Sequence, residues 1–267
     1  MHSRHWRLIL DGPQSGAVNM AVDRALLRSC ESGRSSPVVR LYGWREPTLT
    51  VGYSQSLERD LDLARCRELG IPVVRRPTGG RALLHDREVT YAVAAPVNHP
   101  DFHPGLREAF AGVAKLLGFG LEELGVCPDP LSLHRPPRRL DRGQRSPACF
   151  ASLHHYEITV GGKKLIGSAQ KRTHRAFLQH GSLLLENDPA LLTGLCRYPD
   201  AAARRRDLEE LKRRTLTVFS ARGRPAGFQE AADALARGFR RGLGDECTVT
   251  GLTAEEQALR DAFLRGS

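Results

Sequence analysis

The chain has 267 residues, 40% of them hydrophobic, which is enough to bury a core as one large domain or two small ones. No stretch approaches the roughly 20 apolar residues of a membrane span, and the first residues contain no apolar run of secretory length, so we expect a cytoplasmic protein. Six cysteines without metal-type spacing favour reduced thiols over a disulfide framework or a zinc site.

The formal net charge of +10 predicts attraction to an acidic partner. Nucleic acid is the usual interpretation of such a charge. However, only 6% of the residues are aromatic, and we find no RNA-binding aromatic motif or recognition-helix pattern. Because the basic residues are spread along the chain, an acidic protein partner agrees with the composition equally well.

The first part of the chain predicts short strands and one amphipathic helix. Trp6 to Leu10 is typical of a strand, and Asp11-Gly12-Pro13 should then turn the chain. Apolar residues at helical spacing predict a helix from Asn19 to Cys30. Val38 to Tyr42 and Thr48 to Gly52 predict a pair of strands.

A glycine-containing motif follows a helix that we predict from Asp60 to Leu69, ended by Gly70 and Pro72. The motif reads RRPTGGRALLH over residues 75–85. Its two adjacent glycines permit positive φ and a close approach of a ligand to the backbone, while the flanking arginines can bind an anionic or carbonyl oxygen. By itself, a Gly-Gly pair between arginines indicates an ordinary turn.

The middle of the chain predicts a strand, a helix and a loop. Glu88 to Val97 is β-rich, and Leu106 to Leu117 has apolar residues on one helical face. Residues 128–147 are rich in Pro, Arg and Gly and lack periodicity, which predicts a loop. Because this loop directly precedes Cys149, it can be either a flap over a site or a surface insertion.

The run from Ser146 to Arg172 predicts a hairpin that carries a thiol and an amine. Cys149 lies where the first strand begins and Lys164 where the second begins, and the turn at Gly161-Gly162 can bring them together. An ammonium beside a thiolate stabilises it and lowers the cysteine pKa. Without further context, Cys149 is also typical of a small buried hydrophobe and Lys164 of a solvated charge.

The last part of the chain predicts one more strand, within Lys171 to Leu185, and then helices. The sequence is helical and basic from Asp188 to Arg214, and apolar spacing predicts further helices at Phe228 to Leu243 and Thr253 to Leu264. We find no repeat and no convincing linker, so we expect a single domain over residues 1–267.

Several of these motifs resemble one known family. The run KLIGSAQ (residues 164–170) resembles the lysine-plus-GSA signature of the biotin/lipoate protein ligase superfamily. A cysteine fifteen residues before that lysine, the RRxTGGRxxLH motif and LQHGS (residues 178–182) resemble its branch of cysteine-dependent octanoyltransferases. The resemblance implies an α+β fold, a mixed β-sheet flanked by helices, with the ligase-like catalytic region at residues 34–247.

The resemblance also implies a reaction. An octanoyl group would pass from octanoyl-acyl carrier protein to a specific lysine of a lipoyl-domain protein, such as the glycine-cleavage H protein, in the first step of protein lipoylation. Cys149 would form an acyl-thioester, and Lys164 would hold the thiolate and assist the incoming amine. No cofactor, metal, nucleic acid or membrane would be needed, and the protein would be a monomer.

The resemblance assigns the remaining site residues. Substrate-binding positions would be Arg76, Thr78, Gly79, Gly80, Arg81, Gly167, Ser168 and Ala169. His85 and His180 would contact these residues from the side away from the substrate and hold them in place. His180 and the tandem pair His154 and His155, where the chain departs from the family pattern, are rival partners for Cys149. Lys164 is preferred because it lies within the matched motif.

Two other functions remain as alternatives. An ATP-dependent lipoate or octanoate protein ligase of the same fold needs the lysine but no cysteine, so Cys149 argues against it. A basic nucleic-acid- or protein-binding module without catalysis would tolerate the loss of both Cys149 and Lys164.

Overall fold

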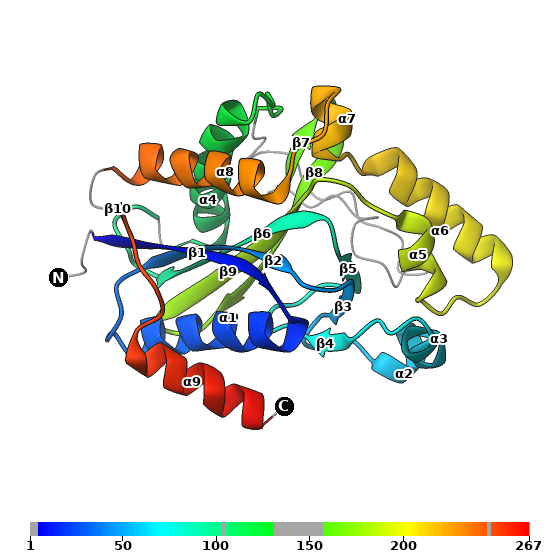
Figure 1. Cartoon of the computed structure of the whole chain (residues 1–267), viewed down its shortest axis with the longest axis horizontal. Helices are drawn as coiled ribbons and strands as arrows, with labels where there is room; N and C mark the ends of the chain where they lie inside the picture. The colour runs from blue at the N-terminus through cyan, green and yellow to red at the C-terminus, as the bar shows by residue number, and fades with distance from the viewer. Residues whose placement is uncertain (1–4, 103–104, 131–156, 245–246, 267) are drawn as a thin grey trace.

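Two β-sheets organise the chain in the computed structural model, which describes residues 5–102, 105–130, 157–244 and 247–266. Within these residues the larger sheet has seven strands in the order β10-β1-β2-β6-β9-β8-β7, and the smaller has the order β4-β3-β5 (Figure 1). The strands of the larger sheet are β1 (Trp6–Gln14), β2 (Val38–Trp44), β6 (Glu88–Pro96), β7 (Ile158–Val160), β8 (Lys163–Arg172), β9 (Ala176–Leu184) and β10 (Cys247–Val249). Those of the smaller sheet are β3 (Thr48–Val51), β4 (Val73–Arg75) and β5 (Leu83–His85).

The larger sheet is mixed. Strand β1 is parallel to β10 and β2, whereas the pairs β2–β6, β6–β9, β9–β8 and β8–β7 are antiparallel. Helices cover both of its faces. This arrangement confirms the α+β fold with a mixed sheet flanked by helices.

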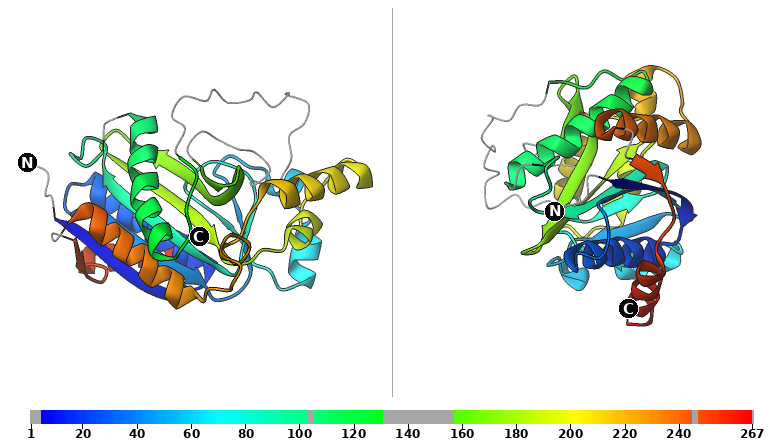
Figure 2. Two further views of the ribbon diagram at one scale, coloured as in Figure 1. Left: turned by 90° about the horizontal axis from the view of Figure 1, so that it is seen from above. Right: turned by 90° about the vertical axis from the view of Figure 1, so that its left-hand side faces the viewer.

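The helices form layers on either side of the larger sheet (Figures 1 and 2). Helix α1 (Gly16–Glu31) covers one face, and α9 (Ala254–Arg265) packs on α1. Helices α4 (Leu106–Glu123) and α8 (Phe228–Leu243) pack together on the other face. The shorter helices α2 (Leu57–Asp60), α3 (Leu63–Glu68), α5 (Pro189–Gly194) and α7 (Val218–Arg222), with the basic α6 (Ala201–Arg214), complete the described elements.

Strand β9 explains why polar groups are found inside the sheet. It is central, with β6 and β8 as its neighbours, and every one of its nine residues is buried. Its sequence AFLQHGSLL nevertheless contains Gln179, His180 and Ser182. Since a buried polar group costs free energy unless it is hydrogen-bonded, these three side chains need partners inside the protein.

The structure corrects three predictions in the first part of the chain. Residues Asp11 to Pro13 do not turn the chain, because β1 continues to Gln14 with an irregularity in register between Leu10 and Pro13. Such an irregularity tolerates a proline, which lacks a backbone N–H. The two strands predicted as a pair, β2 and β3, lie in different sheets, because β2 already has β1 and β6 as neighbours.

The third correction concerns the helix predicted from Asp60 to Leu69, which is divided into α2 and α3. Leu61 pairs instead with Cys196 in an isolated β-bridge. Asp62 then begins α3 by accepting a hydrogen bond from the backbone N–H of Arg65 at 3.0 Å. The predicted helices that became α1, α4, α8 and α9 are confirmed.

The predicted hairpin is confirmed for its described residues. Strands β7 and β8 pair around Gly161 and Gly162, both of which have positive φ. Asp129 stabilises this turn by accepting hydrogen bonds from both glycine N–H groups. Cys149 and most of the predicted loop at 128–147 lie outside the described residues. No helix in the described ranges is both long and apolar enough to cross a membrane.

Candidate active site

A cavity of about 250 Å³ lies where β8, β9 and the loop between β4 and β5 meet. Residues of α1 and β2 complete its wall through Met20, Tyr42 and Trp44. Most of the predicted site residues line this cavity: Arg76, Gly79, Gly80, His85, Lys164, Gly167, Ser168, Ala169 and His180. Segments about 90 residues apart in the sequence therefore contribute to one chamber.

Lys164 is the buried amine of this cavity. It is only 1% exposed, because β8 turns its side chain inward while that of the preceding Lys163 faces solvent. Its ammonium forms a buried ion pair with the carboxylate of Glu157, which also lines the cavity. The two residues belong to the two sides of the glycine-turned hairpin. No role for Glu157 was expected from the sequence.

The loop from Arg76 to Arg81, called the glycine loop below, packs closely against the end of β3. A Cβ atom on Gly52 would lie 2.0 Å from the carbonyl oxygen of Gly80, so only glycine fits at position 52. Gly80 itself has a φ of +99°, a conformation that favours glycine. The backbone N–H of Tyr53 donates to the carbonyl of Thr78 at 2.8 Å, which fixes the loop to the strand end.

Arg76 folds back onto the glycine loop. Its guanidinium donates to the carbonyl oxygens of Gly79 at 2.9 Å and Arg81 at 2.8 Å, and to the hydroxyl of Thr50 at 3.0 Å. Arg76 is buried, whereas Arg81 is half-buried and does not line the cavity. Their assignment to substrate binding stays a prediction.

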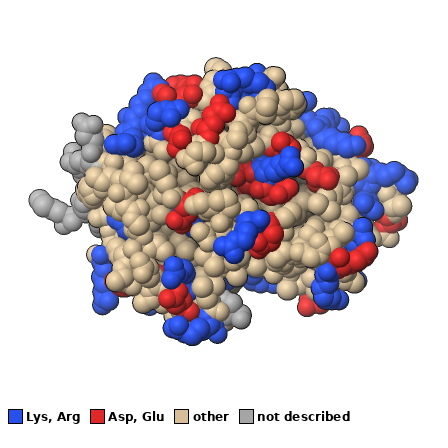
Figure 3. Space-filling view, in the orientation of Figure 1, with Lys and Arg blue, Asp and Glu red and all other residues tan. Residues whose placement is uncertain are grey.

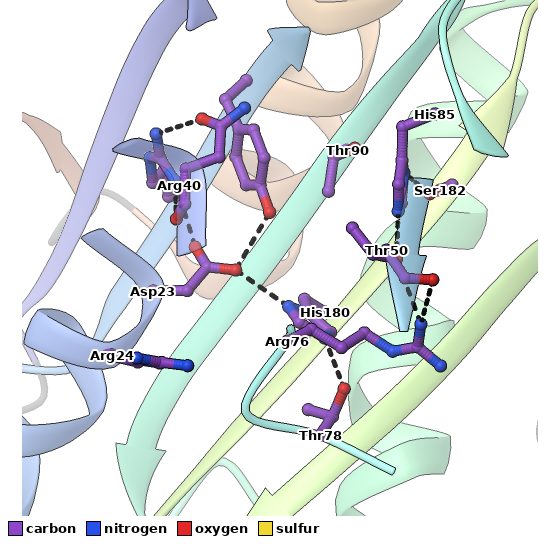
Figure 4. Close-up of polar contacts among 12 residues, drawn as sticks. Asp23, Arg24, Arg40, Thr50, Arg76, Thr78, His85, Thr90, His180 and Ser182 are labelled. Atoms are coloured by element: carbon purple, nitrogen blue, oxygen red, sulfur yellow. Dashed lines mark hydrogen bonds and ion pairs between the residues drawn. The ribbon is translucent and has the colours of Figure 1, made fainter. Parts of the chain in front are cut away.

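Two histidines, each paired with a carboxylate, form one side of the cavity. His180 Nδ1 lies 2.8 Å from Asp23 Oδ2, and its Nε2 lies 2.6 Å from the hydroxyl of Thr78. His85 Nδ1 lies 2.8 Å from Glu88 Oε1. Both rings are therefore oriented by a buried acid, and Figure 4 shows this for His180 and Asp23.

The buried acids are surrounded by further donors. Asp23 also pairs with Arg40 at 3.0 Å and accepts the hydroxyl of Tyr42 at 2.9 Å. Burial and the nearby Asp23 raise the pKa of Tyr42 well above its ordinary value, so Tyr42 remains a donor. Burial alone would raise the pKa of Glu88, but the adjacent His85 and the hydroxyl donors lower it below its ordinary value.

Comparisons with known proteins identify the family of this chain. A model of the lipoyl protein ligase A/B catalytic domain matches residues 15–240. The chain belongs to this family. Octanoyltransferase LipM of Brevibacillus brevis is 38% identical over 261 residues, covering 97% of this chain and 95% of that protein. Octanoyltransferase LipM of Kyrpidia tusciae is 39% identical over 259 residues, covering 97% and 94%.

Solved structures agree with the family assignment. A bipartite lipoate protein ligase from Thermoplasma acidophilum, described with its E2 lipoyl domain, has a TM-score of 0.76 at 25% identity and covers 99% of this chain and 93% of that one. Lipoate-protein ligase A bound with ATP shares the fold, with a TM-score of 0.73 at 23% identity over 99% and 95%. The chain is an acyltransferase of the octanoyltransferase branch, as its motifs predicted.

Sequence reasoning missed the charged side chains that support the cavity wall. Asp23 lies between Met20 and Leu27 on the buried face of α1, so a carboxylate among apolar positions was an available signal. Arg40 similarly interrupts the apolar run of β2. Glu88 opens the buried strand β6 and carried no comparable signal, because charged residues often begin strands.

The cysteines differ in accessibility. Among the described ones, Cys30, Cys66, Cys196 and Cys247 are buried and Cys127 is exposed. Burial raises the pKa of Cys30 and of Cys196 to about 12. Such thiols are poor nucleophiles near neutral pH, because the thiolate is the reactive form.

Proposed function

We propose that this acyltransferase moves an octanoyl group from octanoyl-acyl carrier protein to a specific lysine of a lipoyl-domain protein, through an acyl-thioester on Cys149. The proposed acceptor is the glycine-cleavage H protein. The chain acts as one domain and as a monomer. Its net charge of +10 favours encounter with acidic carrier and acceptor proteins.

The observation that carries the proposal is the buried Lys164 ammonium in the wall of the cavity. The same cavity is lined by Gly79 and Gly80 of the glycine loop and by Gly167, Ser168 and Ala169, so two of the motifs that suggested acyl transfer contribute to one chamber. Lys164 is paired with Glu157, but even a paired buried charge is costly to desolvate, and a desolvated charged group in the wall of a cavity is typical of a functional site.

The proposed reaction has two acyl transfers. In the first, the Cys149 thiolate attacks the thioester carbonyl, the S–C bond to Cys149 forms, and the carrier's thiolate leaves and takes up a proton. In the second, the acceptor lysine amine attacks the acyl carbon and loses a proton as the amide forms, while Cys149 leaves as a thiolate. Lys164 stabilises the thiolate in both steps and assists the incoming amine.

The described cysteines support Cys149 as the nucleophile. The four buried thiols have a raised pKa. Cys127 is exposed but does not line the cavity. Cys149 lies in the motif PACF, fifteen residues before Lys164, as the octanoyltransferase resemblance requires.

Intact-mass measurement after mixing with octanoyl-acyl carrier protein tests the proposal. We expect a gain of one octanoyl group, located on Cys149 by peptide mapping and lost in Cys149→Ala. Cys127→Ala is the matched control and should still be acylated. Transfer to the acceptor should need neither ATP nor magnesium. An adduct that survives in Cys149→Ala would overturn the nucleophile, and turnover only with ATP would favour a ligase.

A further inference from the structure

Two hydrogen-bonded chains of side chains end on the glycine loop, and each begins at a buried acid. Figure 4 shows Asp23, His180 and Thr78 of one chain, and His85, Thr50 and Arg76 of the other. The acids, Asp23 and Glu88, lie in α1, which is distant from the loop in sequence, and at the start of β6, which follows the loop after β5. Neither acid lines the cavity.

The first chain, called the Asp23 relay, joins α1 and β9 to the loop. Asp23 Oδ2 accepts from His180 Nδ1 at 2.8 Å, and His180 Nε2 lies 2.6 Å from Thr78 Oγ1. Arg40 and Tyr42 hold Asp23 from the other side. All five residues are buried, so no solvent molecule competes easily for these hydrogen bonds.

The second chain, called the Glu88 relay, reaches the loop through a small-sheet strand. Glu88 Oε1 accepts from His85 Nδ1 at 2.8 Å, and His85 Nε2 lies 2.8 Å from Thr50 Oγ1. Thr50 Oγ1 accepts from Arg76 Nη1 at 3.0 Å, and Arg76 in turn donates to the carbonyl of Gly79. This relay therefore ends on the backbone of the loop.

The donor and acceptor roles follow from the end groups. Each Nδ1 faces a carboxylate, so in the neutral tautomer that this contact favours it donates, and each Nε2 then accepts a threonine hydroxyl proton. In the Glu88 relay the hydrogen bonds then run in one direction, from the Arg76 cation to the Glu88 anion. Trp44 stacks on His85 with ring centroids 4.0 Å apart, which prevents the ring from turning out of this alignment.

Among the described residues, few charged or titratable groups contact the two relays. Asp23 faces Arg40, Tyr42 and His180. Glu88 Oε1 also accepts from Trp44 Nε1 at 3.1 Å and from the hydroxyls of Thr90 and Ser182. Each acid is thus held from several elements, which fixes the position of the histidine that it orients.

The Glu88 relay ends on the carbonyl of Gly79, so it bears on which way the loop backbone faces. Because a trans peptide is planar, the N–H of Gly80 points opposite to the C=O of Gly79, which Arg76 holds. The N–H is therefore directed away from Arg76. A loop containing two adjacent glycines has other accessible conformations, so this orientation needs support from outside the loop.

We propose that Asp23 and Glu88 are positioning residues for acyl-donor binding, which hold the glycine loop through His180 and through His85, Thr50 and Arg76. The proposal rests on the proposed function for its substrate. It concerns donor binding rather than the acyl transfer step, because neither acid contacts Lys164 in the described contacts and both lie behind the cavity wall.

Single-turnover acylation with octanoyl-acyl carrier protein tests the proposal in Asp23→Asn and Glu88→Gln. We expect the half-saturating donor concentration to rise about 10-fold or more, as for other supporting carboxylates. The maximal acylation rate at saturation should change much less. Glu256→Gln is the matched control, because it removes a buried carboxylate paired with Arg7 at 2.6 Å that lies outside the cavity wall. Unchanged donor saturation in both test variants would overturn the proposal.

A double-mutant cycle separates a relay from general destabilisation. Thr78→Val removes the hydroxyl at the loop end of the Asp23 relay with little change in volume. If Asp23 acts through His180 on Thr78, the double variant should lose no more donor affinity than either single variant. If the factors by which the two single variants lose donor affinity multiply in the double variant, the relay is wrong. Thr78→Ser keeps the hydroxyl and should restore donor saturation.

Hydrogen exchange of the backbone amides of residues 76–82 gives a readout that does not depend on catalysis. We expect faster exchange there in Asp23→Asn and Glu88→Gln than in wild type, and no change in Glu256→Gln. If wild type is not acylated but exchange responds, the proposed function fails, while Asp23 and Glu88 still hold the glycine loop. If wild type is acylated but exchange and donor saturation are unchanged, the positioning role fails.

Discussion

The ammonium of Lys164 pairs with the carboxylate of Glu157 across the β7–β8 hairpin, with both side chains almost fully buried. A thiolate approaching this pair would meet an attractive cation and a repulsive anion together. The proposed effect of Lys164 on Cys149 would therefore depend on Glu157, for which no role was expected from the sequence. Removing each member of the pair should shift the Cys149 pKa in opposite directions.

Iodoacetamide alkylation of Cys149 as a function of pH measures this effect. We expect the midpoint to fall in Glu157→Gln and to rise in Lys164→Ala by about 1 to 3 units, because an opposite charge within about 4 to 6 Å has an effect of that size. Lys163→Ala, whose side chain is exposed, is the control. A Cys127→Ser background removes the exposed competing thiol.

Equal midpoints in all variants would exclude Lys164 as the partner of Cys149 and would favour His180, His154 or His155. Since removing one partner of a buried ion pair costs about 3 to 5 kcal/mol, melting temperatures must accompany these measurements. Lys164→Met combined with Glu157→Gln removes both charges and avoids an unpaired buried ion.

Lys164→Arg separates the two proposed roles of the lysine. Arginine keeps the positive charge but does not give up a proton in proteins. We expect acylation of Cys149 to continue while transfer to the acceptor lysine slows by about 100-fold or more, in the range of general acid–base effects. Intact mass and acceptor octanoylation, followed in the same samples, check this. Unimpaired transfer would restrict Lys164 to holding the thiolate.

Glu88 should contribute stability that depends on pH. Its pKa in the folded protein lies below the ordinary value of 4.5, so the folded state favours the carboxylate. The contribution is present above the ordinary pKa and is lost as the pH falls through the folded pKa. Urea unfolding of wild type and Glu88→Gln should therefore differ most near neutral pH and converge below pH 4.5. A difference that grows in acid would contradict this sign.

Alanine substitutions at Gly52, beside the glycine loop, and at Gly79, within it, should have different effects on stability and donor binding. A Cβ on Gly52 would lie 2.0 Å from Gly80 O, so Gly52→Ala should cost about 1 to 3 kcal/mol of unfolding free energy. Gly79 has open space around its Cβ position and lines the cavity. Gly79→Ala should therefore leave stability nearly unchanged and weaken donor binding. Calorimetry and donor saturation check both, and equal melting temperatures for the two variants would contradict the prediction.

The sequence by itself determined much of this protein because its signals are local. Apolar spacing predicted the helices that became α1 and α8, and the Gly161-Gly162 pair predicted the turn between β7 and β8. The motifs around Arg76 and Lys164 predicted the family, since the chemistry that they carry depends on residue type and spacing.

The tertiary structure decided which residues meet. Asp23 and His180 are 157 positions apart in the sequence, and only the packing of α1 on β9 places their side chains 2.8 Å apart. Strand β3 is part of the smaller sheet because both edges of β2 are paired with β1 and β6. Its position there places Thr50 beside His85 and Arg76. No local pattern specifies such contacts, because they arise when distant elements bury their apolar faces together.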